Sequence, residues 1–160
     1  MSFFPLSYLD LNVCEILVDA TTTPSNLNFH SIIKDTGNSI LLVDSQTIQL
    51  PANSTFLIKA NVSFNKTVTN TTGTSVVLKM TDENSNNLDY QAWGTGVFFD
   101  GLTGGLTGVS CTSIDLMSIL FAQSTSRNIR FNLTASLEVS IEKDSANLYT
   151  PNSSITILYT

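Results

Sequence analysis

Apolar and polar side chains alternate without interruption over residues 129–142, IRFNLTASLEVSIE. Every second residue from Ile129 to Ile141 is apolar, and the residues between them carry charged, amide or hydroxyl groups. Successive side chains of a β-strand point to opposite faces, whereas a helix would scatter the same apolar residues around its axis. The segment therefore predicts one long strand that crosses a whole sheet and buries one of its faces.

The same two-residue period recurs elsewhere in the chain. In residues 55–64, every second side chain is apolar, from Phe56 to Phe64. Further strands are predicted at 39–44, 47–50, 76–81, 88–93, 97–99, 113–122 and 154–159, with a strand or a short helix at 11–18. Loops are expected at 21–26, 66–75, 82–87 and 123–128, where Pro, Gly or small polar residues cluster. Seven or more strands without a long amphipathic helix predict an all-β, antiparallel sandwich.

We expect one domain with two parts. Residues 37–160 hold most of the predicted strands and form the sandwich, while residues 1–36 comprise an N-terminal arm and the first strand or strands. The large apolar residues of the arm are Phe3, Phe4, Leu6 and Tyr8. Two interpretations are open: the arm folds back on its own domain, or it docks on a neighbouring subunit.

Charged residues make up only 12% of the chain, and the formal net charge is −6. The polar remainder is rich in Ser, Thr and Asn, as in many extracellular β-proteins and virion components. The seven Lys and Arg residues are spread along the sequence. Nucleic-acid binding needs such residues clustered, so no nucleic-acid partner is expected. No basic leader segment precedes Lys34 and no apolar stretch approaches the ~18 residues of a membrane span, which predicts synthesis in a cytoplasm without membrane insertion.

No set of residues in the sequence matches a catalytic, cofactor or metal motif. One histidine, His30, and two cysteines, Cys14 and Cys111, are too few for a recognisable zinc site, and no nucleophile signature surrounds any serine. The cysteines are expected as buried thiols, with a bridge between them left open. The acidic segment DENSNNLD at 82–89 lacks the spacing of a calcium loop and is expected to be a solvated turn. The sequence therefore predicts a protein that is not an enzyme and that carries no cofactor or metal.

Six of the eight glycines fall in residues 94–108, GTGVFFDGLTGGLTG. This density of glycine disfavours regular structure and predicts a long loop. The segment lacks the Lys and Ser/Thr pair of a Walker phosphate loop. The aromatic residues that flank or enter it are Tyr90, Trp93, Phe98 and Phe99. They are either core or interface residues, or they form a recognition tip at which aromatic rings stack on a sugar or a partner.

Near the start of the sandwich, a short apolar strand precedes TIQLPANSTFLIKANVSF, and near its end the strand predicted at 129–142 precedes a loop and a last strand, SSITILYT. This order of strands resembles the jelly rolls of tumour-necrosis-factor-like and complement-head-like proteins. The resemblance covers residues 37–160 and concerns the pattern of strands, not a sequence motif. It implies a jelly-roll topology, a tight homotrimer around a threefold axis, and no catalytic residue.

Virus-borne members of the resembled group are fibre heads and capsid decoration proteins. We therefore expect a structural virion protein of a bacteriophage, made in the host cytoplasm, that decorates a capsid or forms the head of a fibre. Its partners would include other virion proteins such as a major capsid protein. The alternative is a carbohydrate- or receptor-binding module, as at a tail-fibre tip, that binds a host glycan through residues 88–108.

Overall fold

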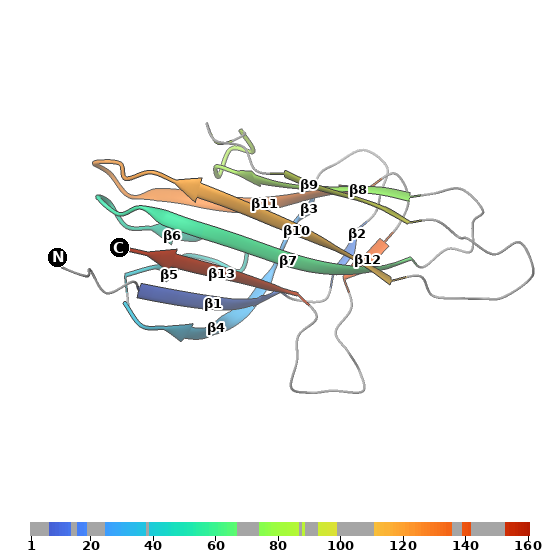
Figure 1. The fold of residues 1–160 in the computed structure, drawn as a ribbon, viewed down its shortest axis with the longest axis horizontal. Helices are drawn as coiled ribbons and strands as arrows, with labels where there is room; N and C mark the ends of the chain where they lie inside the picture. Colours follow the sequence, from blue (N-terminus) through green and yellow to red (C-terminus); the bar gives the residue numbers. More distant parts are fainter. Residues whose placement is uncertain are drawn as a thin grey trace, which may run out of the picture.

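The structure is a computed structural model, and it describes residues 7–13, 16–18, 25–37, 39–66, 74–86, 88, 93–98, 111–135, 139–141 and 153–160. Every regular element in these ranges is a β-strand, and all of the strand pairs are antiparallel (Figure 1). Within the described part of the chain, no helix has the length and hydropathy needed to cross a membrane. The prediction of an all-β, antiparallel sandwich is confirmed.

The larger sheet, sheet A, has seven strands and is centred on β7. Its strands are β1 (Ser7–Val13), β2 (Ile16–Val18), β4 (Phe29–Asp35), β7 (Phe56–Lys66), β10 (Cys111–Leu120), β12 (Val139–Ile141) and β13 (Ser154–Tyr159). One edge of β7 pairs with β10, and the other pairs with β13 and, further along, with β12. β1 and β4 extend the sheet beyond β13, and β2 extends it beyond β12.

The second sheet, sheet B, has six strands and is centred on β11. Its strands are β3 (Ser25–Asn26), β5 (Leu41–Leu42), β6 (Ile48–Leu50), β8 (Thr74–Thr81), β9 (Trp93–Phe98) and β11 (Arg127–Ala135). β8 pairs with one edge of β11, while β6 and β3 pair with the other edge at different points. Contacts between β9 of sheet B and β10 of sheet A close one side of the sandwich.

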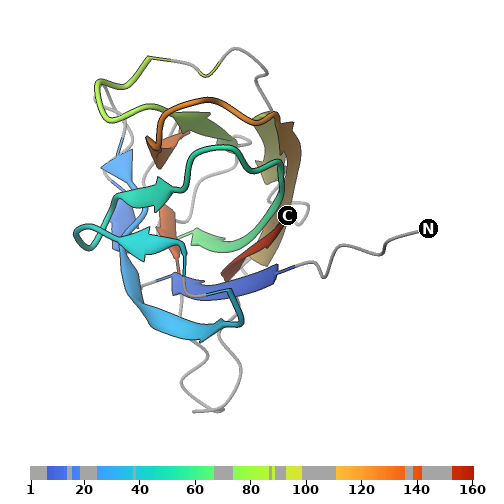
Figure 2. The same cartoon turned by 90° about the vertical axis from the view of Figure 1, so that its left-hand side faces the viewer.

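The core lies between the sheets and takes alternate side chains from each strand, as the two-residue period requires. The fully or nearly fully buried residues include Phe56, Ile58, Ala60 and Val62 of β7, Ile129, Phe131 and Leu133 of β11, and Ile155, Ile157 and Tyr159 of β13. Phe131 of sheet B meets Phe29 of sheet A edge to face, with 6.4 Å between the ring centroids. The view along the sandwich in Figure 2 shows the strands of both sheets surrounding this interior.

The C-terminal strand is fixed against the segment that follows β4. Tyr159 is buried, stacks on Phe56 at 5.9 Å between centroids, and accepts a hydrogen bond from the backbone N–H of Ser39 at 3.4 Å. A Cβ atom at Gly37 would collide with the hydroxyl of Tyr159 and would lie 2.7 Å from the Cβ of Ser7. Only glycine at position 37 therefore lets these segments approach so closely.

The prediction of a single strand over residues 129–142 is wrong in its extent. β11 ends at Ala135 in sheet B, whereas Val139–Ile141 form β12 in sheet A. The segment thus supplies strands to both sheets. Alternation shows that each strand buries one face, but it carries no information on whether the chain changes sheet between the two strands.

Other segments also differ from their predictions. Residues 25–26, expected in a loop, form β3 against β11, and residues 29–35, for which no strand was predicted, form β4. The strand in the glycine-rich segment runs over 93–98 and includes two glycines. Pairing with β8 along its whole length offsets the conformational entropy that glycine loses in a strand. At 11–18, the strand alternative holds for the described residues, which lie in β1 and β2.

Candidate functional site

A row of large side chains crosses the outer face of sheet A, the face turned away from the core. The strand register places Leu158 of β13 beside Leu57 of β7, and Leu57 beside Ile119 of β10. On the far side of Leu158, the backbone of Tyr8 in β1 pairs with that of Leu158. Leu57 is 37% exposed and Ile119 is 50% exposed. Because the residues on either side of each of them are buried in the core, Leu57 and Ile119 point to solvent.

Two more exposed apolar residues flank the row on the side of β10. Met117 is 66% exposed, and Phe121, which directly follows the strand, is 57% exposed. Together with Ile119 they form the β10 strip. β10 hydrogen-bonds to β7 and to no other described strand, so this strip lies along one margin of sheet A.

The outer face of sheet A becomes polar with distance from the apolar row. The next row along the strands holds Asp10, Thr156, Lys59 and Met117, and the one after it holds Ser154, Asn61 and Asp115. The hydroxyl of Thr156 donates to the Asp10 carboxylate at 3.2 Å. The Asn61 Nδ2 donates to the Asp115 Oδ1 at 2.6 Å. The polar end of the face is therefore matched internally, while its apolar end meets solvent.

This distribution is a signal of association. A solvated face of an antiparallel sheet is normally polar, and contiguous exposed apolar side chains on a folded protein mark interaction sites. Leu41 and Val43 at the margin of sheet B are also exposed, each at 55%, but neither lies on the outer face of sheet A. The apolar row and the β10 strip together are the first candidate functional surface.

The outer face of sheet B is organised around the guanidinium of Arg130. Its Nε donates to the hydroxyl of Thr47 at 2.8 Å, and its Nη1 donates to the carbonyl oxygen of Glu83 at 3.0 Å. Its Nη2 lies 3.8 Å from the Asp44 carboxylate. The backbone N–H of Gln46, 2.7 Å from Asp44, contributes most to a lowered pKa of that carboxyl, and Thr47 and Arg130 lower the pKa further against the opposing effect of burial.

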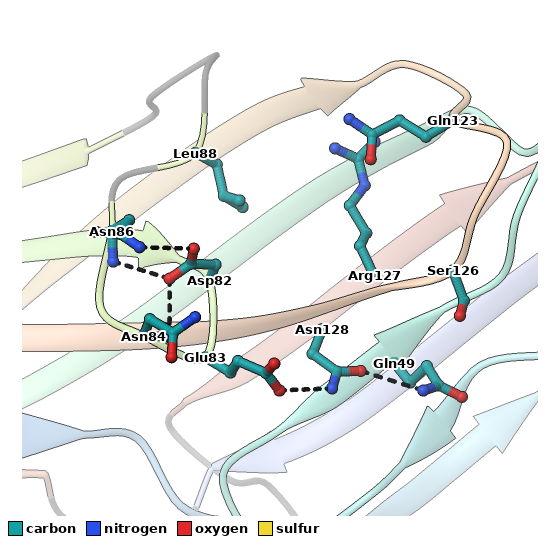
Figure 3. A pocket seen from close by; sticks show the side chains of 10 residues that line it. All are labelled: Gln49, Asp82, Glu83, Asn84, Asn86, Leu88, Gln123, Ser126, Arg127 and Asn128. Carbon is teal, nitrogen blue, oxygen red and sulfur yellow. Dashed lines mark hydrogen bonds between the residues drawn. The ribbon is translucent and has the colours of Figure 1, made fainter.

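A hollow of about 560 Å³ opens at one end of sheet B, between the β8–β9 turn and the β10–β11 loop (Figure 3). Half of the residues that line it are carboxamides: Gln49, Asn84, Asn86, Gln123 and Asn128. The others are Asp82, Glu83, Ser126, Arg127 and the apolar Leu88. This amide hollow is the second candidate functional surface.

Asp82 fixes the turn that forms one wall of the amide hollow. Its Oδ1 accepts hydrogen bonds from the backbone N–H groups of Asn84 and Asn86, both at 2.8 Å, and its Oδ2 accepts one from the Asn86 Nδ2 at 3.0 Å. These bonds, led by that of the Asn86 side chain, lower the pKa of the Asp82 carboxyl. Ser85 adopts a left-handed backbone conformation with φ of 64°. The turn predicted from the sequence is confirmed for residues 82–86.

The floor of the amide hollow is a chain of hydrogen bonds between three side chains. Asn128 of β11 donates from Nδ2 to the Glu83 Oε2 at 2.8 Å and accepts at Oδ1 from the Gln49 Nε2 at 3.2 Å. Figure 3 shows the three side chains in line. A carboxamide has two donor hydrogens and two acceptor lone pairs, so each amide in this chain keeps unused capacity toward the hollow. The floor thus presents donors and acceptors side by side.

The residues predicted as a recognition tip and a docking arm fall partly outside the described chain. Trp93 and Phe98 are the first and last residues of β9, where they pair with Lys79 and Thr74 of β8. Tyr8 belongs to β1. The described residues do not include Tyr90, Phe99, Phe3, Phe4 or Leu6. The recognition-tip and docking-arm hypotheses therefore stay predictions.

Of the residues considered for metal or nucleophile chemistry, His30 and Cys111 lie on different strands of sheet A. His30 lies in β4 and Cys111 begins β10, while Cys14 lies outside the described residues, so both alternatives for the cysteines stay open. Within the ranges that the structure describes, no three His, Cys, Asp or Glu side chains gather into a group that could hold a metal ion.

Sequence reasoning assigned a role to neither surface. A signal for the β10 strip existed, because residues 113–122 are apolar on both of their alternating faces. The amide hollow has no comparable signal. Gln49, the turn after β8 and the start of β11 are far apart in the sequence, and only the pairing of β6 and β8 with β11 brings them together.

The fold is similar to solved structures of tumour-necrosis-factor-like proteins. A crystal structure of murine APRIL superposes with a TM-score of 0.58 at 9% identity, covering 98% of this chain and 100% of that one. The structure of Eiger TNF from S. frugiperda superposes with a TM-score of 0.55 at 11% identity, covering 98% and 94%. At the level of sequence, neither protein-family models nor curated proteins match this chain. The chain therefore has a tumour-necrosis-factor-like jelly-roll fold, as the order of its strands predicted.

Proposed function

We propose that this protein is a non-enzymatic structural subunit that works as a homotrimer, and that the trimer is a component of a virion. The observation that carries the trimer is the apolar row on the outer face of sheet A, continued by the β10 strip. A fold similar to that of APRIL and Eiger TNF supports a role in association over catalysis.

The arrangement of the apolar residues favours a ring over a twofold pair. The β10 strip lies at the margin of sheet A, whereas Leu57 and Leu158 lie further in, on β7 and β13. A strip at the margin of one subunit can pack on the inner part of the next subunit's face, and such a heterologous contact closes when the rotation is a simple fraction of a turn. Each contact would bury apolar surface, which contributes roughly 25 cal/mol per Å² before the entropy costs of association.

The charges on this face are compatible with such a contact. Lys59 stands in the row beside the apolar row, on the central strand β7, while Asp115 lies on β10 at the margin of the same face. When the margin of one subunit approaches the middle of the next, charges of opposite sign can come together at the polar end. The apolar end of the face then provides the affinity between subunits, and the charged groups at the polar end fix how the two subunits are aligned.

The oligomeric state tests this proposal directly. Multi-angle light scattering of the purified protein at micromolar concentration should give three times the 17.4 kDa of one chain. Replacing Ile119 with Lys places a charge where the apolar row meets the β10 strip and should yield a folded monomer, because this side chain is already half exposed in the single chain. The matched control is Leu41→Lys, a similarly exposed site in β5 of sheet B, which should leave the trimer intact.

A wild-type mass of one chain would overturn the trimer, and so would a control variant that dissociates as readily as Ile119→Lys. Circular dichroism of each variant should retain the strand signal of the wild type. This measurement separates loss of association from loss of folding.

The virion role draws on the sequence and on its resemblance to virus-borne jelly rolls. The low share of charged residues and the abundance of Ser, Thr and Asn support it. In this proposal the protein is made in the cytoplasm of a host cell, and its trimers decorate a capsid or form the head of a fibre through contacts with a major capsid protein. Mass spectrometry and antibody labelling of virus particles purified from the producing cells should find the protein at the particle surface. Its absence from such particles would leave the trimer without a virion role.

A further inference from the structure

We propose that the amide hollow on sheet B is a binding site for a neutral saccharide. This inference goes beyond the trimer, because none of the residues that line the hollow belongs to the apolar row or to the β10 strip. Its lining comes from β6, β11, the segment that follows β8 and the β10–β11 loop, so it can be changed by substitutions that leave the apolar row intact. Association and sugar binding are therefore separable properties of this chain.

The chemistry of the lining selects the class of ligand. A sugar hydroxyl both donates and accepts a hydrogen bond, and carboxamides are the side chains that offer both functions in fixed positions. In the floor of the hollow, Asn128 lies between Glu83 and Gln49, so acceptor and donor groups follow one another. Adjacent hydroxyls of a sugar ring match this alternation.

Charge argues against the competing small ligands. The hollow holds two carboxylates and one guanidinium, which leaves a formal charge of −1 and disfavours phosphate, sulfate and sialic acid. A cation needs several oxygen ligands directed at one point. Both oxygens of Asp82 already accept hydrogen bonds from Asn84 and Asn86. The group that remains suited to the hollow is uncharged and rich in hydroxyls.

The polar groups of the hollow are also held in place before any ligand binds. The three hydrogen bonds to Asp82 fix the turn on one side, and the chain from Glu83 to Gln49 fixes the floor. Preorganised groups lose little conformational entropy when they bind a ligand. Leu88 supplies one apolar contact for the C–H groups of a ring. With a single apolar side chain in an open hollow, affinity for one sugar unit is expected in the millimolar range.

The test uses the full-length protein and a defined set of sugars. Saturation-transfer NMR with the methyl glycosides of glucose, galactose, mannose and N-acetylglucosamine should detect binding of at least one of them. Asn128→Ala removes the middle of the hydrogen-bonded floor and should weaken that binding by about tenfold or more. Gln123→Ala removes an exposed amide at the rim, where loss of folding is not expected, and should weaken binding by about two- to tenfold.

Two controls separate this proposal from the trimer. Ser124→Ala changes an exposed side chain of the same loop that does not line the hollow, and Ile119→Lys changes the apolar row. Both variants should bind the sugar as the wild type does, whatever the oligomeric state, because a methyl glycoside occupies one site at a time. The proposal is overturned if none of the four glycosides binds, if only sialylated or sulfated sugars bind, or if Gln123→Ala and Asn128→Ala bind like the wild type.

Discussion

The outer faces of the two sheets cover the same core but present opposite kinds of surface. On sheet A, the large side chains of Leu57, Met117 and Ile119 reach solvent in one contiguous area. On sheet B, Arg130 and Asn128 each engage two or more partners through hydrogen bonds. The outer face of sheet A exposes apolar side chains to solvent. The outer face of sheet B exposes polar side chains that hydrogen bonds hold in position.

This difference separates two kinds of recognition within one small fold. Exposed apolar surface gains free energy only when a large, complementary surface removes it from water, so sheet A fits a protein subunit. An ordered set of amides gains little from apolar burial and discriminates by the position of its donors and acceptors, so sheet B fits a small polar ligand. A jelly roll can hold both because its two sheets turn opposite faces outward.

The largest expected effect on stability comes from the hydrophobic core between the two sheets. Phe131→Ala should lower the free energy of unfolding by about 3–5 kcal/mol, because it leaves a cavity beside Phe29 where the two sheets meet. Urea denaturation in the Ile119→Lys background measures this loss without a contribution from association. The matched control is Phe121→Ala on the exposed β10 strip, which should change the free energy of unfolding by less than about 0.5 kcal/mol. Equal losses at the two positions would contradict the assignment of the Phe121 side chain to the exposed β10 strip.

A smaller effect on the free energy of unfolding should distinguish Arg130 from Asp44 in the polar network on sheet B. Arg130→Ala removes hydrogen bonds to Thr47 and to the Glu83 carbonyl and should cost about 1–3 kcal/mol of unfolding free energy. Asp44→Asn removes the ion pair of a half-exposed carboxylate, 3.8 Å from Arg130, but keeps an oxygen that can accept from the Gln46 N–H, and should cost less than about 1 kcal/mol. Thermal denaturation of both variants provides the measurement. A larger loss at Asp44 than at Arg130 would mean that the Asp44 carboxylate, and not the hydrogen bonds of Arg130, organises this face.

Much of the fold could be predicted because strand periodicity is a local property. The alternation at residues 56–62 and 155–159 identified the buried side chains of β7 and β13 correctly. The break between β11 and β12 could not be predicted, because it depends on which sheet each segment joins. β3 could not be predicted either, because its two residues form a strand through pairing with β11 and not through a strand preference of their own.

The candidate surfaces were predictable to different degrees for the same reason. The apolar residues of the β10 strip lie on one strand, and the second apolar face of residues 113–122 was visible in the sequence. The apolar row additionally requires the register of three strands. The floor of the amide hollow requires β6 and β8 to pair on either side of β11, which places Gln49 and Glu83 beside Asn128. Long-range pairing of this kind leaves no trace in local composition.

The smallest expected effect is a dependence of the free energy of unfolding on pH, and it should arise from two carboxyl groups on the sheet B side of the sandwich. The pKa of Asp82 is lowered in the folded protein by hydrogen bonds from Asn86 and Asn84, and the pKa of Asp44 is lowered mainly by the Gln46 backbone N–H. A carboxyl whose pKa is lower in the folded than in the unfolded chain stabilises the fold above its ordinary pKa of 3.8, and this contribution disappears as the pH falls through the folded value.

Asp82→Asn tests this dependence because an amide does not ionise in this range. The wild type should exceed the variant in urea midpoint at pH 6, and the difference should narrow as the pH falls below 3.8, the ordinary pKa of the carboxyl. The carboxylate accepts its hydrogen bonds as a charged group only while it is ionised, so protonation removes the advantage of Asp over Asn. A difference that stays constant down to strongly acidic pH would show that the turn is held by its shape alone, and the contrast between the two faces would then lose its electrostatic part.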